Sequence, residues 1–304
     1  MNKSKPILVT GSPRSGTSWA GQMIGQASLT HYVHEPFNIS SNPCLCGVNF
    51  KYWFQYLSLG NYNEFRNHLE HTIYPAYTGI GLFNTFAEMT RSRRIRPLLR
   101  YLKSYLSRRV LIKAPMAVFS AETLAHLFEM DVVVLIRHPA AIVSSYKELN
   151  WTHPFSHFLN QPELMEEQLA PFRHEIEDFV NNEYDIVDQI ALLWKLIHYK
   201  ITKYQETHPN WIFLRYEDLA LDPIEGYRKI FHQLDLPFSD HTYAMIQAHN
   251  LRHIPSKSSD PYSIKQNPRL VISKWREKLT ATEIGRIRKR VEGVSSFFFQ
   301  DDEW

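Results

Sequence analysis

The sequence has few cysteines and no long apolar run. Cys44 and Cys46 are its only cysteines, and they lie too close together to staple a fold, which points to a reducing compartment. Without a nearby His pair they make a weak metal site, so ordinary loop cysteines are the simpler interpretation. No stretch approaches the roughly eighteen apolar residues of a membrane span. A strand pattern begins almost at the N-terminus and leaves no room for a signal peptide, so we expect a soluble cytoplasmic protein without a transmembrane segment.

An excess of charge of one sign is also missing. The formal net charge is only +3 with 15 His, which does not indicate a nucleic-acid partner. With 44% hydrophobic and 13% aromatic residues, the chain of 304 residues can bury a full core as one large domain or two small ones. No repeat, low-complexity stretch or linker divides it. We therefore expect one domain over residues 1–304, with 40–109 as an insertion that lines an acceptor site; nothing in the pattern specifies an oligomeric state.

The most informative stretch lies near the start of the chain. Residues Ile7–Thr10 form a short apolar, β-branched run that ends at Gly11, Gly16 follows five residues later, and a helical pattern continues through Trp19–Ala27. A strand, a Gly-bounded loop and a helix start turn backbone N–H groups toward one point, where the helix N-terminus adds partial positive charge. This pattern predicts an anion site, most often for a phosphate.

The loop departs from the usual phosphate-loop pattern G-x-x-x-x-G-K-[ST] at one position. Gly11, Gly16 and Ser18 match, but Thr17 replaces the Lys, and the cation is Arg14 inside the loop. A plain turn between a strand and a helix is the alternative. The strand–loop–helix context favours the phosphate loop.

Further strands are predicted at Thr30–Val33, Val110–Lys113, Asp131–Arg137 and Trp211–Arg215. Helices are predicted at Ala121–Met130, Glu163–Val180, Asp185–Thr207, Pro223–Leu234, Ser239–Asn250 and Thr282–Val291. The alternation of strands and helices, and the continuously apolar strand that begins at Asp131, indicate an α/β fold. We expect a P-loop NTPase-like, three-layer fold with a mostly parallel central sheet.

Ionisable residues follow three of the predicted strands. Glu35, Lys113 and Arg137 stand at or just after strand ends, and the carboxyl ends of parallel strands form the ligand edge of such a sheet. Arg137 stands where a nucleoside triphosphatase would offer a magnesium-binding Asp, and Ser145 follows two turns later. The pattern suits a nucleotide with phosphates at two separate places. For Glu35 alone, a surface carboxylate at a strand end is the alternative.

Three other segments have open interpretations. The pattern of Arg91–Arg109 predicts an amphipathic basic helix. Its charged face is either exposed to solvent or in contact with an anionic acceptor or a membrane surface. The aromatic cluster within Tyr52–Tyr56 packs in a core or lines an acceptor pocket. The polar segment His249–Arg269 is interpreted as a cover over the nucleotide.

Four motifs, in order along nearly the whole chain, resemble the sulfotransferases that use 3′-phosphoadenosine 5′-phosphosulfate (PAPS). Pro13–Trp19 resembles their 5′-phosphosulfate loop, and Leu135–Pro139 through Ser145 resembles their 3′-phosphate motif. The other two are Phe213–Leu219 with Asp222-Pro223, and Lys274–Arg276 with Leu279. The loop Lys is Arg14 here, as in many carbohydrate-type and bacterial members. The His base of cytosolic members is missing from Lys113-Ala-Pro115, whereas Glu35-Pro36 matches the Glu-Pro of carbohydrate-type members.

The resemblance implies that a sulfuryl group is transferred from PAPS to a hydroxyl of a small-molecule or carbohydrate acceptor. It also implies that no metal is required. It implies that Glu35 is the base. It implies that Arg14 and Lys113 stabilise charge on the sulfuryl oxygens and on the leaving phosphate oxygens. Trp19 and Tyr216 would contact the adenine. By the same resemblance, the 5′-phosphate is bound by the backbone amides of the loop residues Ser15, Gly16, Thr17 and Ser18. The 3′-phosphate is bound by Arg137 and Ser145. A P-loop kinase with an altered loop and a non-catalytic nucleotide-binding protein of the same fold are the alternatives.

Overall fold

A five-stranded parallel sheet forms the centre of the fold. A computed structural model describes residues 5–28, 30–40, 46–74, 109–250 and 267–304. The strands lie in the order β2-β3-β1-β4-β5, and every neighbouring pair is parallel. They are β1 (Ile7–Gly11), β2 (Thr30–His34), β3 (Arg109–Lys113), β4 (Asp131–Ile136) and β5 (Ile212–Arg215). The predicted strands and the parallel sheet are confirmed.

Alternate residues of the strands enter two separate apolar layers. In β1, Ile7 and Val9 pack with Trp19 of the following helix, whereas Leu8 packs on the opposite face with Ile112 and Val134. Successive side chains of a strand point to opposite faces, so a strand covered on both sides is apolar along its length. This arrangement explains why the strand sequences are continuously apolar. It also gives the fold three layers, with the sheet between two layers of helices.

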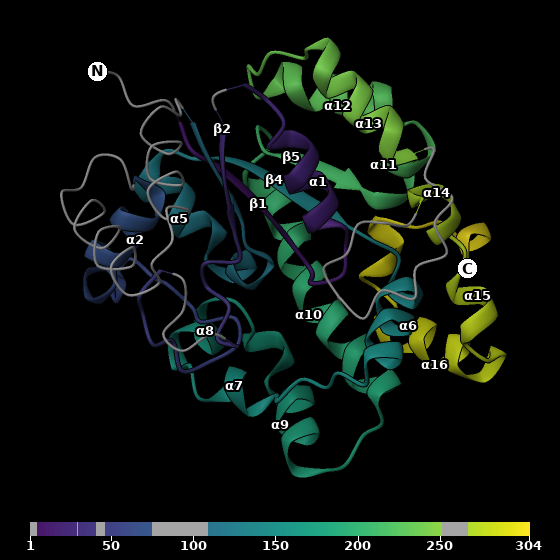
Figure 1. The fold of residues 1–304 in the computed structure, drawn as a ribbon. Helices are drawn as coiled ribbons and strands as arrows, with labels where there is room; N and C mark the ends of the chain where they lie inside the picture. Colours follow the sequence, from purple (N-terminus) through teal and green to yellow (C-terminus); the bar gives the residue numbers. More distant parts are fainter. Residues whose placement is uncertain (1–4, 29, 41–45, 75–108, 251–266) are drawn as a thin grey trace, which may run out of the picture.

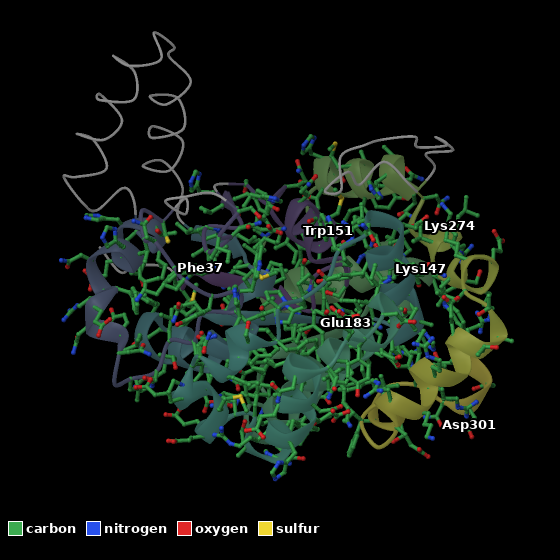
Figure 2. All side chains as sticks on the ribbon, turned by 90° about the horizontal axis from the view of Figure 1, so that it is seen from below. Phe37, Lys147, Trp151, Glu183, Lys274 and Asp301 are labelled. Carbon is green, nitrogen blue, oxygen red and sulfur yellow. The ribbon has the colours of Figure 1, made fainter. Side chains whose placement is uncertain are left out.

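Helices cover both faces of the sheet (Figure 1). The face of Ile7 is covered by α1 (Thr17–Ile24), α11 (Tyr216–Leu221), α12 (Pro223–Gln233) and α13 (Asp240–Asn250). The face of Leu8 is covered by α5 (Ala121–Phe128), α6 (Pro139–Leu149), α10 (Ile186–Thr207) and α16 (Ala281–Val291). Side chains fill the space between these layers (Figure 2).

Shorter elements complete the described part of the chain. They are α2 (Arg66–Ile73), α7 (Ser156–Leu159), α8 (Pro162–Glu167), α9 (Arg173–Asn181), α14 (Pro268–Val271) and α15 (Trp275–Lys278), with the 3-10 turns η1 (Tyr62–Glu64), η3 (Pro115–Ser120), η4 (Ala170–Phe172), η5 (Ser295–Phe297) and η6 (Asp301–Glu303). Side chains cap three of the predicted helix starts, including that of α12, where Asp222 accepts from the Glu225 N–H. Asp185 accepts a hydrogen bond from the Asp188 N–H, and Thr280 forms a capping box with Glu283.

The predicted single helix over Glu163–Val180 is wrong. The chain forms α8 and α9 there, separated by the 3-10 turn η4. Pro171 lies inside this turn and has no N–H to donate, and its ring would clash with the carbonyl of an α-helix one turn earlier. The apolar spacing continues across the interruption, which is why the pattern reads as one helix.

Some predictions fall outside the described residues. Of the basic segment Arg91–Arg109, only Arg109 is described; it is the first residue of β3, so it does not belong to a helix, and it pairs with Asp131. Most of the predicted cover also falls outside, because residues 251–266 are not described. Cys44 is likewise outside, and Cys46 is buried.

Buried histidines make the stability of this fold sensitive to acid. His198 of α10 is fully buried, stacks on Trp194 at 3.8 Å between ring centroids, and burial lowers its pKa to about 3. The unfolded chain, with an ordinary pKa near 6.5, binds a proton below that pH, but the folded chain does so only near pH 3. Folding stability is therefore lost as the pH falls through this window, by roughly 2 kcal/mol for one such histidine between pH 7 and pH 5.

We expect His198→Phe to remove the part of the loss of folding stability between pH 7 and pH 5 that comes from His198. The measurement is the free energy of unfolding in urea at pH 7 and pH 5, for wild type and variant. His174→Phe is the control, because the His174 side chain is fully exposed and its loss should leave the difference unchanged. An unaltered pH dependence in His198→Phe would contradict the assignment.

Candidate active site

A cavity of about 840 Å³ opens at the carboxyl ends of the parallel strands. Ligands of open α/β sheets bind at this edge, where the strand order reverses. The predicted site residues that line it are Arg14, Gly16, Thr17, Ser18, Trp19, Glu35, Arg137, Ser145 and Tyr216. Ser15 and Lys113 are buried and are not among the lining residues. The cavity therefore brings together most, but not all, of the residues predicted from the sequence.

The loop between β1 and α1 has the conformation of an anion cradle. Its backbone enters the left-handed region at Gly11 (φ 135°), Arg14 (φ 69°) and Gly16 (φ 97°). A Cβ on Gly16 would lie 2.5 Å from Cδ2 of Tyr216, so no larger residue fits there. Gly16 caps α1 and offers no side-chain acceptor to its first N–H groups. Those groups are left for an anion.

One side chain of the loop contacts the second predicted phosphate position. Nε of Arg14 donates to Oγ of Ser145 at 2.8 Å, which joins the loop to α6. Oγ of the next residue, Ser15, is buried, does not line the cavity and has no hydrogen-bond partner within the described part of the chain. Arg14 is therefore the loop side chain that links the two predicted phosphate positions.

Arg137 is held in place from three directions. Its guanidinium donates to the Arg14 carbonyl at 2.8 Å and lies 4.4 Å above the centre of the Tyr216 ring. Its own carbonyl accepts from Nε1 of Trp194 at 2.9 Å, so the apolar stripe of α10 supports the end of β4. Burial raises the pKa of Tyr216 to about 12, and the nearby Arg137 charge opposes this rise. Tyr216 is therefore a neutral ring that orients the arginine.

Trp19 and Tyr216 form one aromatic wall. Trp19 packs edge-on against Tyr216 at 5.6 Å and against Tyr227 at 5.4 Å, and stacks on His249 at 5.8 Å. Its Nε1 has no hydrogen-bond partner among the residues that the structure describes. Aromatic faces with a spare N–H suit a flat ring that carries hydrogen-bond acceptors.

Glu35 and Lys113 meet at the ends of β2 and β3. The Lys113 ammonium forms an ion pair with Oε1 of Glu35, and the Glu35 N–H donates to the Lys113 carbonyl at 2.7 Å. The lysine stem runs beneath α1, where a Cβ on Gly21 would be 3.2 Å from its Cβ. Burial lowers the pKa of Lys113, and the Glu35 charge opposes that change. In this arrangement Lys113 contacts the carboxylate rather than the cavity.

The C-terminal segment adds two cations, of which Lys274 belongs to the fourth motif and Lys278 was not singled out by any sequence pattern. Lys274 and Lys278 line the cavity, and Lys278 pairs with Glu148. The stacking of His138, the residue after Arg137, on Trp275 at 4.8 Å and 7° between planes holds α15 against the strand end. Burial, with nearby arginines, lowers the pKa of His138 to about 3, so the ring is neutral. Figure 2 labels Lys274 in this segment.

A further part of the cavity lining is aromatic and carries uncharged polar groups. Its residues include Asn38, Ser40, Trp53, Phe54, Met116, Trp151 and His153. Ser40, Trp53 and Phe54 belong to the segment that was expected to line an acceptor site. Trp151, labelled in Figure 2, follows α6 and faces the Arg14 guanidinium at 5.9 Å. Asn38 and Trp151 belong to no motif, so only the fold identifies them.

The described residues lack two further features. They contain no group of three or more His, Cys, Asp or Glu placed to hold a metal ion. Within the same ranges, no helix combines the length and the apolar character needed to cross a membrane.

Known proteins share this fold. The structure resembles the sulfotransferase domain from the curacin biosynthetic pathway with a TM-score of 0.51 and 15% identity, over 94% of this chain and 97% of that one. The sulfotransferase domain of the Synechococcus olefin synthase gives 0.46 and 18%, over 99% and 98%. A mouse sulfotransferase complexed with PAP gives 0.48 and 13%, over 99% and 87%.

The comparison of the sequence with a family model gives stronger evidence of relationship than these structures do. No curated protein matches the chain. The family model described as "Sulfotransferase family", however, matches residues 6–240, from the start of the phosphate loop's strand to the first residue of α13. This range holds the loop, Glu35, Lys113, Arg137 and Tyr216, and the first matched structure has the same fold. The chain belongs to the sulfotransferase family.

Proposed function

We propose that the protein transfers a sulfuryl group from PAPS to a hydroxyl group of a carbohydrate or glycoconjugate. The observation that carries the proposal is the pairing of two anion positions at one sheet edge. The loop and the α1 N-terminus form the first, and Arg137, fixed against Tyr216 and the Arg14 carbonyl, forms the second. A donor with phosphates at its 5′ and 3′ positions needs both.

The loop amides of Ser15 to Ser18 would hold the 5′-phosphate, and Arg137 and Ser145 the 3′-phosphate. Trp19 and Tyr216 would contact the adenine. Lys274 and Lys278 bring further positive charge to the same part of the cavity. Nothing in this assignment requires a residue outside the described ranges.

The reaction exchanges one sulfur–oxygen bond for another. The acceptor oxygen bonds to sulfur while the bond from sulfur to the 5′-phosphate oxygen breaks, and its electron pair stays on the leaving phosphate. Glu35 takes the proton of the acceptor hydroxyl. Arg14 stabilises charge on the sulfuryl and leaving oxygens. Lys113 is buried and does not line the cavity, so we assign it to orienting the Glu35 carboxylate through its contact with Oε1 instead of to the sulfuryl charge.

The acceptor end of the cavity supports a carbohydrate. The rings of Trp53 and Trp151 offer flat apolar faces, while Ser40 and Thr152 offer uncharged hydrogen-bonding groups. Sugar rings present both an apolar face and hydroxyl groups.

Calorimetry and a turnover assay test the proposal. Adenosine 3′,5′-bisphosphate without metal should bind with a dissociation constant on the order of micromolar, about −8 kcal/mol. PAPS turnover should be seen with maltose or octyl glucoside in a panel that also holds 2-naphthol, 1-dodecanol and hyaluronan. If the protein binds ATP with magnesium and does not bind the bisphosphate, the result would indicate a kinase instead of a sulfotransferase. Bisphosphate binding without turnover on any acceptor would favour a non-catalytic nucleotide-binding protein.

A further inference from the structure

The turn after β2 folds back on itself and brings Asn38 beside Glu35. Glu35 is in the left-handed region with φ 45°, which is uncommon for a residue other than Gly, Asn or Asp. Its carbonyl accepts a hydrogen bond from the Asn38 N–H at 3.2 Å. The side chains therefore leave this turn next to each other. Strained backbone of this kind is found at sites where side-chain placement matters.

The orientation of the Asn38 amide follows from a second contact. Its Oδ1 accepts from the Ser40 N–H at 2.9 Å, and a backbone N–H can only donate. The amide is therefore not interchangeable with its flipped form, and the NH2 group must face Glu35. Nδ2 donates to Oε2 of Glu35 at 2.6 Å.

The two oxygens of Glu35 have different surroundings. Oε1 contacts Lys113, which is fully buried and does not line the cavity. Oε2 contacts Asn38, which does line it. The carboxylate is thus held at one end by a buried cation and at the other by an amide at the cavity surface.

We propose that Asn38 is a positioning residue for Glu35, and that Oε2 is the oxygen that receives the acceptor proton. The inference rests on the proposed function. One lone pair of Oε2 accepts from Asn38, and the other is left for the proton as the acceptor O–H bond breaks. The Asn38 hydrogen bond fixes the direction of that second lone pair. In this assignment Asn38 contacts the Glu35 carboxylate and no atom of the donor or the acceptor.

Loss of Asn38 should therefore reduce the rate more than the binding. Misplacement of a catalytic group by about 1 Å can cost on the order of 100-fold in rate. For Asn38→Ala we expect kcat to fall about 10- to 100-fold, with KM for PAPS and the affinity for adenosine 3′,5′-bisphosphate changed less than about threefold. Asn38→Asp keeps the shape of the side chain but loses the donor and adds a charge beside Glu35, so we expect it to be no more active than Asn38→Ala.

A double-mutant cycle separates positioning from a merely structural role. PAPS turnover is measured, with maltose and octyl glucoside as acceptors, for wild type, Asn38→Ala, Glu35→Gln and the double variant. If Asn38 acts through Glu35, Asn38→Ala should cause no further loss in the Glu35→Gln background. Asn181→Ala, at the exposed end of α9, is the control.

The outcomes distinguish this inference from the proposed function. An equal loss in both backgrounds, or wild-type activity of Asn38→Ala or Asn38→Asp, would overturn the role of Asn38 while leaving the transferase assignment intact. Absence of both bisphosphate binding and wild-type turnover would overturn the proposed function, and with it this inference. Urea unfolding of the same four proteins checks the contact itself, because additive losses of stability would contradict the Asn38–Glu35 hydrogen bond.

Discussion

Glu35→Gln should lower kcat by about 100- to 10,000-fold, the usual contribution of a positioned general base. Gln has nearly the same shape as Glu and its carbonyl oxygen can still accept from Lys113, but it cannot take a proton. Since Glu35 is assigned to the acceptor hydroxyl and not to the nucleotide, the affinity for adenosine 3′,5′-bisphosphate should change by less than about threefold. Turnover of PAPS and calorimetry with the bisphosphate measure the two effects separately.

Two variants control this experiment. Glu183→Gln makes the same chemical change at an exposed position, labelled in Figure 2, and should leave turnover unchanged. Glu35→Asp keeps a carboxylate but shortens its reach, so its kcat should lie between those of wild type and Glu35→Gln. Turnover of Glu35→Gln close to the wild-type value would remove Glu35 as the base.

Arg137→Ala should weaken binding of adenosine 3′,5′-bisphosphate by about 10- to 100-fold, because a hydrogen bond to a charged group contributes roughly 1.5–3 kcal/mol. Arg137 also touches the Arg14 carbonyl and the Tyr216 ring, so a loss of affinity alone could come from a disturbed loop. Adenosine 5′-monophosphate resolves this point, since it lacks the 3′-phosphate. Its affinity should change by less than about threefold.

Calorimetric titration of both nucleotides into wild type and variant gives the answer. Arg228→Ala, an exposed arginine of α12 outside the cavity, is the control and should change neither affinity. Arg137→Lys keeps the charge but loses the planar guanidinium that lies over Tyr216, so its affinity should be intermediate. Equal losses for both nucleotides in Arg137→Ala would show that Arg137 supports the loop instead of reading the 3′-phosphate.

The sequence predicts the parts of this site that depend on short stretches of chain. The phosphate loop combines a strand, two glycines and a helix within eighteen residues, so its conformation follows from local preferences. The positions of Glu35, Lys113 and Arg137 at one edge also follow, because parallel strands place their carboxyl ends together. The interruption of the helix at Pro171 was missed because the apolar spacing continues past it.

Contacts that depend on tertiary packing could not be predicted in the same way. Nothing in the pattern shows that Glu35 adopts a positive φ, and this conformation is what brings Asn38 back to its carboxylate. Lys278 reaches the cavity because Trp275 stacks on His138, a residue more than a hundred positions earlier. Only the folded chain specifies such pairs.

The wide sequence separation of the site has a consequence for synthesis of the chain. Glu35 and Lys113 meet through pairing of β2 with β3, and the cations of α15 come near the C-terminus. At translation rates of about 5–20 residues per second, roughly 7 to 27 seconds pass between the addition of Arg137 and that of Lys274. A nascent chain therefore contains Glu35 and the phosphate loop for several seconds before the last cations of the nucleotide site have been added. Tight nucleotide binding should stabilise only finished molecules, and so favour them over truncated ones.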